Sequence, residues 1–255
     1  MTAPLFFADA SLLQELRDAS IGDVIELGGA EGRHAATVRR LVAGEKLDLA
    51  DGEGLVCAAE VTAVLSQGLQ ARVLSRTQFP APQLRVTVVQ ALAKGDRDER
   101  AVETMTEVGV DVIVPWQAAR SIVRWDSARA QKAVTRWRTT AREAAKQARR
   151  PWLVDVPPLQ TTADVVSRIE AVAGSGGVAV LLHEESDRPL ASLTVPKAGD
   201  VVLVVGPEGG ITPDEVAAFE AASAVAHRLG PTVLRTSTAG TVAAAIVMAN
   251  SGRWT

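Results

Sequence analysis

Two segments in the last quarter of the chain carry residue types that could bind a small ligand. The first, Gly206-Pro207-Glu208-Gly209-Gly210-Ile211-Thr212, directly follows the apolar run Val201 to Val205, which has the composition of a buried parallel strand. Ligands of open α/β sheets bind beyond the carboxyl ends of such strands. Because glycine lets the backbone approach a ligand closely, this turn could enclose a flat, adenosine-like group. An ordinary tight strand-to-helix connection has the same pattern, and no Gly-Lys-Ser/Thr follows to make it a phosphate loop.

The second segment is LGPTVLRTSTAG, from Leu229 to Gly240, and it leads into an alanine-rich stretch that ends near Asn250. Thr236, Ser237 and Thr238 are candidate caps for a helix that starts here. The alanines that follow offer small faces for close packing against a neighbouring segment or a second subunit. Read without the first segment, this pattern indicates only a turn and a buried terminal helix.

The elements that must position these segments are those of an α/β domain. From Leu84 onward, apolar β-branched runs near 84–92, 111–115, 177–182, 200–205 and 225–229 alternate with helical stretches, which predicts a parallel sheet covered by helices. Three helix ends can be read directly. Asp96 with Glu99 forms a capping-box pattern, Gly109 marks a helix end, and Thr212-Pro213-Asp214-Glu215 predicts a helix start immediately after the glycines.

The first seventy-five residues have a different pattern, that of a small barrel. Short strands are predicted at 21–27, 46–50 and 55–64, with Asp51-Gly52-Glu53-Gly54 as a hairpin turn. One short helix between Gly32 and Val42 should interrupt them and expose Arg33, Arg39 and Arg40. The segment 78–82, with its two prolines, is a plausible linker, so we predict two domains, 1–75 and 76–255.

Charge is unevenly distributed along the chain. The net charge is only −3, yet residues 120–150 hold ten Lys and Arg against two carboxylates, a net charge of +8. Such a block on an acidic body is expected for docking on a phosphate backbone. An amphipathic helix with a solvated face would give the same count.

Composition excludes several classes of protein. The longest late apolar stretch, 243–249, is far too short to cross a bilayer, and four charged residues interrupt the first twenty positions. Cys57 is the only cysteine, so no internal disulfide can form, and the three histidines lack a ligand-like spacing. We therefore expect a soluble cytoplasmic protein without a structural metal.

Taken together, the two ligand-binding segments resemble the RsmE family of RNA methyltransferases within the SPOUT superfamily. The resemblance extends upstream, through QALAKGDR at 90–97, EVGV at 107–110 with IVP and Arg120-Ser121, and EAAKQARRP at 143–151. It includes RHAATVRRLVAGEKLDLADG at 33–52 and so covers nearly the whole chain. One departure is that the usual acidic residue of the family before Gln147 is Lys146 here.

The resemblance implies both a fold and an activity. The fold is an α/β knot in which the carboxyl-terminal segment threads a loop to make a deep trefoil knot, behind an amino-terminal PUA-like RNA-binding β-barrel. The activity is methylation of N3 of one uridine in 16S rRNA of the small ribosomal subunit, with S-adenosylmethionine as donor. Members of the family are homodimers.

Carried over position by position, the resemblance also names site residues. The donor pocket should comprise Leu182, His183, Gly206, Pro207, Glu208, Gly209, Gly210, Ile211, Leu229, Gly230, Leu234, Arg235, Thr236, Ser237, Thr238 and Ala239. Candidate substrate contacts are Arg33, His34, Arg39, Arg40, Lys94, Arg97, Arg120, Arg124, Gln147, Arg149 and Arg150. His34 could equally pack against the barrel.

Methylation at N3 requires removal of the proton that this nitrogen carries. The site therefore needs a base, or a cation that stabilises the uridine anion enough for water to accept the proton. Arg235 is the candidate cation, and Glu208 or His183 is the candidate base, although each could have a structural role.

Two other functions share parts of this pattern. A ribose 2′-O methyltransferase of the same superfamily would have the same knot and donor, but its usual Ser-Leu-Asn-Val run is replaced here by LRTSTAGTV. A non-catalytic RNA-binding or ribosome-assembly factor could keep the fold and lack a working donor pocket.

Overall fold

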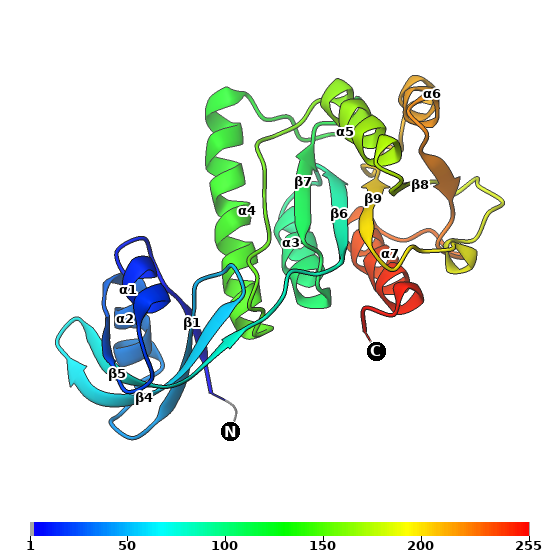
Figure 1. Ribbon diagram of the computed structural model, residues 1–255. Coiled ribbons are helices and arrows are strands. Elements are labelled where there is room, and N and C mark those ends of the chain that lie inside the picture. The colour runs from blue at the N-terminus through cyan, green and yellow to red at the C-terminus, as the bar shows by residue number, and fades with distance from the viewer. Residues whose placement is uncertain (1–2, 255) are drawn as a thin grey trace. The chain divides into compact units, whose positions relative to one another are not determined.

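A computed structural model describes residues 3–254 and divides them into two compact units. The first unit contains the residues up to Ala81 together with Ala145–Leu153, and the second contains Pro82–Ala144 and the residues from Val154 on (Figure 1). Strand β5 (Gly68–Gln78) continues past the predicted boundary at 75/76, and a later segment of the chain belongs to the first unit.

The first unit is built on a mixed five-stranded sheet. Its strand order is β1 (Leu5–Phe7), β3 (Lys46–Ala50), β4 (Leu55–Leu65), β5 and β2 (Val24–Leu27). Only the β1–β3 pair is parallel. Alternate residues of β4 and β5, such as Cys57, Leu69 and Val73, point into the core, as expected for strands with one buried face.

Two strands of this unit, β1 and β5, were not predicted, whereas those at 46–50 and 55–64 are confirmed. The predicted strand at 21–27 begins only at Val24. Helix α1 (Leu13–Asp18) precedes it, and α2 (Gly29–Arg33) runs into a π-helical turn, His34–Val38. The predicted helix at 32–42 therefore starts earlier and ends sooner, since Arg40 has a φ of 54° that no helix tolerates.

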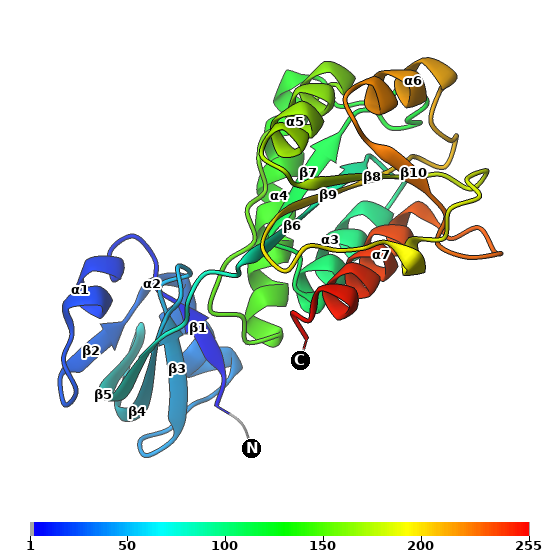
Figure 2. The ribbon, with the colours of Figure 1, turned by 45° about the vertical axis from the view of Figure 1, so that its right-hand side comes forward.

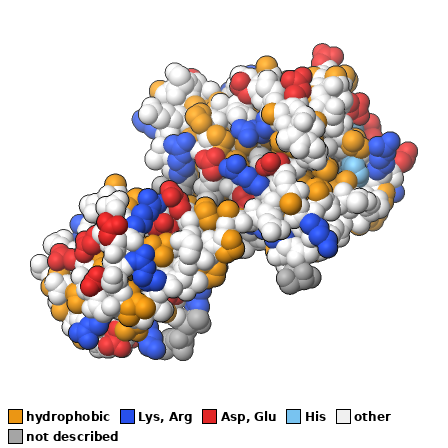
Figure 3. All heavy atoms as spheres, in the orientation of Figure 1, with side chains coloured by type: hydrophobic (Ala, Val, Ile, Leu, Met, Phe, Trp, Pro, Cys, Tyr) orange, Lys and Arg blue, Asp and Glu red, His pale blue; other side chains and the backbone are white. Residues whose placement is uncertain are grey.

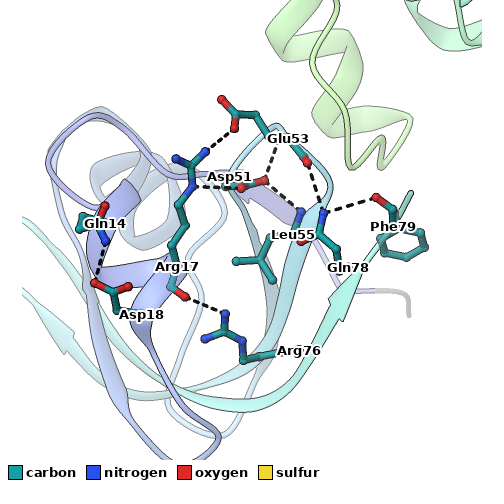
Figure 4. Close-up of polar contacts among 9 residues, drawn as sticks. All are labelled: Gln14, Arg17, Asp18, Asp51, Glu53, Leu55, Arg76, Gln78 and Phe79. Carbon is teal, nitrogen blue, oxygen red and sulfur yellow. Dashed lines mark hydrogen bonds and ion pairs between the residues drawn. The ribbon is translucent and has the colours of Figure 1, made fainter. Parts of the chain in front are cut away.

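A polar network fixes the predicted hairpin turn at residues 51–54 (Figure 4). The nearly buried Asp51 carboxylate accepts from the amides of Glu53 and Leu55 at 2.7 and 3.0 Å, and Arg17 pairs with both Asp51 and Glu53. The turn also contacts the segment Ala145–Leu153, because the Leu153 amide donates to the Gly52 carbonyl at 3.0 Å. A Cβ atom on Gly52 would lie 2.6 Å from the Leu153 side chain, so this contact requires glycine.

Lys146, counted within the basic block, is buried rather than exposed. Its ammonium lies 3.1 Å from a Glu31 carboxylate oxygen, and both side chains are about nine-tenths buried. A buried lysine is tolerated only where an opposite charge offsets its desolvation. Glu31 thus accommodates the one position where the sequence departs from the charge expected from the resemblance.

The second unit has a five-stranded sheet in which every pair is parallel, as predicted. Its order is β10 (Val225–His227), β8 (Val178–Leu182), β9 (Gly199–Val205), β6 (Leu84–Ala91) and β7 (Val112–Trp116). Helices α5 (Thr162–Gly174) and α6 (Pro213–Ala221) cover one face, and α3 (Arg97–Val108) and α7 (Thr236–Ser251) cover the other (Figure 2). Side chains of α4 (Ser127–Gln147) join the core on the α3 side, and a 3₁₀ turn, η2, spans Leu190–Ser192.

Two of the three helix ends read from the sequence are confirmed. Gly109 ends α3 in the left-handed conformation, and Thr212 with Glu215 forms a complete capping box at α6, with Pro213 in the first turn. The capping box at Asp96 is wrong. Asp96 has a ψ of 2° rather than the extended backbone of an N-cap, so its side chain makes no capping bond, and Glu99 pairs instead with Arg136 at 2.8 Å.

Arg253, which follows α7, binds the first residue of β6 and two residues just before β7. Its guanidinium forms a bidentate pair with Asp111 and donates to the carbonyls of Gly109 at 3.0 Å and Leu84 at 3.1 Å. The Asp111 carboxylate also accepts from the Val86 amide. None of the helices in the described part of the chain is long and apolar enough to span a membrane.

Candidate active site

A pocket of about 920 Å³ lies at the carboxyl ends of β8, β9 and β10, within the second unit. This is the edge at which open parallel sheets bind ligands. The two segments singled out from the sequence form much of its wall, because 206–211 and 229–236 both line it. Its apolar surface includes Leu182, Val205 and Ile211.

Nearly all residues assigned by resemblance to the donor pocket line this cavity. Those that do are Leu182, His183, Gly206, Pro207, Glu208, Gly209, Gly210, Ile211, Leu229, Gly230, Leu234, Arg235, Thr236 and Ala239. Ser237 and Thr238 do not line it: Ser237 is buried in the first turn of α7 and Thr238 is exposed. Consecutive residues of a helix point in different directions, so a run of neighbours cannot all face one cavity.

A buried hydrogen-bond chain joins the two segments. The Thr236 hydroxyl, at the start of α7, donates a short hydrogen bond to the Gly206 carbonyl, at the end of β9. Behind this pair, the Gln90 amide nitrogen lies 3.3 Å from both the hydroxyl and the carbonyl oxygen of Thr236. Gln90 is fully buried near the end of β6.

The Glu208 carboxylate is held from two sides. It accepts from the Arg97 guanidinium at 3.1 Å and from the Lys94 amide at 3.3 Å, and its side chain is 22% exposed. Lys94 lies in the connection between β6 and α3, and Arg97 is the first residue of α3. The contact therefore fixes the glycine-rich turn against the start of α3, with Oε1 of the carboxylate accepting both bonds.

His183 also has its acceptor engaged. Its Nδ1 accepts from the Glu185 amide at 3.3 Å, and its own amide donates to the His227 carbonyl at 3.0 Å. A neutral imidazole that accepts at Nδ1 carries its proton on Nε2. In this arrangement the free ring nitrogen is a donor.

Arg235 is the N-cap residue of α7, and its exposed side chain lines the pocket. Its guanidinium makes no hydrogen bond or ion pair with residues 3–254, so it is available to a ligand. Arg120 and Arg228 add positive charge to the wall, whereas Glu184, Glu185 and Glu220 add negative charge. On the face in Figure 3, basic and acidic side chains are correspondingly interspersed over the second unit.

Sequence reasoning missed several parts of this site. Glu184, Glu185, Glu220 and Arg228 line the pocket but come from connections and helices with no recognisable motif. Glu215 was predicted only as a capping residue. Its buried carboxylate also accepts from the Ala119 amide at 2.8 Å and the Thr162 hydroxyl at 3.0 Å, and thereby ties α6 to two other segments.

The candidate substrate contacts divide between the two units. Lys94, Arg97, Arg120 and Arg124 belong to the second unit, and Arg97 and Arg120 line the pocket. The other members, Arg33, His34, Arg39, Arg40, Gln147, Arg149 and Arg150, belong to the first unit.

Within the first unit, His34 and Arg149 differ in their surroundings. His34 packs edge-on against Phe6, with ring centroids 6.0 Å apart, which fits the structural role that the sequence left open. Arg149 is exposed and acts on Asp48, whose pKa is raised by burial and lowered in part by this arginine. Among the described residues, no group of three or more His, Cys, Asp or Glu side chains could hold a metal ion.

Comparisons with known proteins identify relatives of this chain. A family model described as an RNA methyltransferase domain matches residues 80–248, and one described as an RNA methyltransferase PUA domain matches residues 27–74. The ribosomal RNA small subunit methyltransferase E of Mycobacterium bovis is 46% identical over 100% of this chain and 94% of that protein. The protein of the same name from Bacillus subtilis is 29% identical over 83% of this chain and 84% of that protein.

A solved structure has the same fold throughout. The crystal structure of a ribosomal RNA small subunit methyltransferase E from Neisseria gonorrhoeae, bound to S-adenosyl methionine, superposes with a TM-score of 0.84. The match covers 97% of this chain and 98% of the other, at 26% identity.

Proposed function

We infer the function of this chain from its family: it belongs to the ribosomal RNA small subunit methyltransferase E family, whose relatives match it along its full length. We propose that it transfers a methyl group from S-adenosylmethionine to N3 of one uridine in 16S rRNA of the small ribosomal subunit. The observation that carries this proposal is the pocket enclosed by 206–211 and 229–236 at the carboxyl edge of the parallel sheet.

The pocket suits S-adenosylmethionine. Its volume is in the range of small-molecule sites, and it combines apolar side chains with polar and charged ones. A Cβ atom on Gly206 would lie 2.6 Å from Ile211, and one on Gly209 would lie 2.9 Å from the Arg120 carbonyl, so the turn keeps its close shape only with glycine. When bound, this donor supplies an electrophilic methyl group on a sulfonium.

The residues of the chain then have to orient the base and manage its proton. Arg235, whose side chain has no partner among residues 3–254 and lines the pocket, can hold the negative charge that develops on the uracil oxygens. Glu208 and His183 already accept hydrogen bonds, from Arg97 and from the Glu185 amide. We therefore assign proton removal to water, with Arg235 stabilising the uridine anion, rather than to either side chain.

Three further features belong to the same proposal. The second unit forms a deep trefoil knot, a proposal that rests on the family resemblance and on the RNA methyltransferase domain matched over residues 80–248. Two copies form a homodimer, a proposal that rests on the family resemblance; of Ala243, Ala244 and Ala245, the first two are buried in the core and only Ala245 is partly exposed. Residues 1–75 serve as the PUA-like part that docks on the RNA. The proposed substrate, an rRNA, is the ground on which we also propose a cytoplasmic location.

The test is methyl transfer to small subunits that lack the modification. Incubation with labelled S-adenosylmethionine, nuclease digestion and mass spectrometry should yield 3-methyluridine at a single nucleotide. A 2′-O-methylated nucleoside would replace this proposal with the ribose-modifying alternative. Donor binding without any transfer would indicate a non-catalytic factor.

A further inference from the structure

We propose that Gln90 is a positioning residue that sets the shape of the donor pocket through Thr236. Its side chain is fully buried and is not part of the pocket wall. Its amide nitrogen donates toward the carbonyl and hydroxyl oxygens of Thr236, and the Thr236 hydroxyl donates to the Gly206 carbonyl. Gln90 thus reaches both walls of the pocket through one neighbour.

Gln90 is held in place by its strand and by a hydrogen bond to its neighbour. It lies in the sheet between β9 and β7, opposite Val205 and Pro115. Its amide nitrogen also donates to the Ala91 carbonyl at 3.1 Å, which limits the orientations of the side chain. Strand β6 is buried and paired on both edges. Its rigidity therefore holds the Gln90 amide in place, and the amide in turn holds Thr236.

The unpaired oxygen of Gln90 argues against a role in stability alone. Its Oε1 atom is buried and has no hydrogen-bond partner in the described part of the chain. A buried acceptor without a partner is destabilising, so an apolar side chain of the same length would suit the core better. The amide is useful here for its nitrogen, which supplies hydrogens to Thr236.

Gly240 makes the contact possible. It lies one helical turn beyond Thr236, and a Cβ atom there would be 2.8 Å from the Met105 sulfur and 3.3 Å from Gln90 Oε1. Glycine therefore lets the first turn of α7 approach β6 closely enough for Thr236 to meet the Gln90 amide. The glycine at position 240 therefore helps to set the pocket shape, because it allows α7 to pack closely on β6.

The inference rests on the proposed donor, so the experiment measures binding of S-adenosylmethionine by calorimetry. Gln90→Met keeps the length and apolar volume of the side chain but removes the donor hydrogens. We expect about tenfold weaker donor binding, as for the loss of roughly one net hydrogen bond. Thr87→Val, a buried change on the same strand that does not line the pocket, is the matched control and should bind as wild type does.

A double-mutant cycle separates positioning from general destabilisation. If Gln90 acts through Thr236, Gln90→Met should cost less in a Thr236→Val background than in wild type, because only its bond to the Thr236 carbonyl is left to lose. With about a tenfold loss in each single variant, the double variant should therefore stay well short of a hundredfold loss. Independent effects would multiply to about a hundredfold, which would overturn the proposal, as would an unchanged affinity in Gln90→Met.

If Gln90→Met does not fold, variants of Thr236 provide the test of the hydrogen-bond chain. Thr236→Ser keeps the hydroxyl and should retain donor affinity, whereas Thr236→Val should bind the donor about tenfold more weakly; equal affinities would refute the linkage. A wild-type chain that binds no S-adenosylmethionine refutes the proposed function itself. A wild type that binds it, beside an unaffected Gln90→Met, refutes only this inference.

Discussion

The hydrogen bonds of Glu215 predict how much the free energy of unfolding should fall when this side chain is removed. The carboxylate is buried and accepts four hydrogen bonds, from the amides of Ala119 and Thr212 and from the hydroxyls of Thr162 and Thr212. In Glu215→Ala the two hydroxyls can reorient, but the two amides are left without acceptors. At about 1–3 kcal/mol for each buried unpaired amide, the free energy of unfolding should fall by roughly 3 kcal/mol.

Thermal unfolding provides the measurement. For a chain of this size, about 1 kcal/mol corresponds to roughly 2–4 °C, so the melting temperature of Glu215→Ala should fall by about 6–12 °C. The matched control is Asp214→Ala, an exposed neighbour in the same helical turn, which should lose at most about 1 kcal/mol through the helix dipole. Equal melting temperatures for the two variants would refute this account of the carboxylate.

The other predictions concern chemistry, RNA binding and pH. Arg235→Ala should lower the rate of methyl transfer far more than it lowers donor affinity, as single-turnover kinetics and calorimetry would show. The control is Arg188→Ala, at an exposed arginine that does not line the pocket, and it should change neither quantity. A normal rate in Arg235→Ala would remove Arg235 from the mechanism. Binding to small-subunit RNA should weaken steeply with salt in a filter-binding series, and a flat response would contradict docking on phosphates. Burial raises the pKa of Asp98, so the folded state holds this proton more tightly than the unfolded state and gains stability as the pH falls through the raised pKa. Asp98→Asn should remove that part of the pH dependence of unfolding while keeping an acceptor for the Glu99 amide; an unchanged pH profile would show that Asp98 is not responsible.

The parallel sheet and its binding edge could be predicted because each depends on short-range pattern. Strands that are buried on both faces are written as continuous β-branched runs, and the residues after Val205 must lie at the ligand-binding edge. Strand β5 was missed for the opposite reason. Leu69, Ala71 and Val73 alternate with polar residues over a stretch with few strong apolar side chains, so the signal was weak.

The parts of the site that were missed depend on contacts between distant residues. The predicted cap at Asp96 failed because a local motif does not fix ψ, which is close to zero at this residue. The bond from Gln90 to Thr236 joins positions 146 residues apart, and no spacing rule predicts such a pair. Likewise, the basic count over 120–150 did not indicate that Lys146 is buried against Glu31 or that Arg136 pairs with Glu99.

The clamp made by Arg253 has a consequence for the order of folding. It connects residues separated by 142 to 169 positions, so the entropy of closing a very large loop must be overcome before it can form. The same helix begins with Thr236, which closes the pocket. Because the pocket closes through long-range contacts of the same helix, we expect affinity for ligand to appear only late in folding, after the local helices and strands have formed.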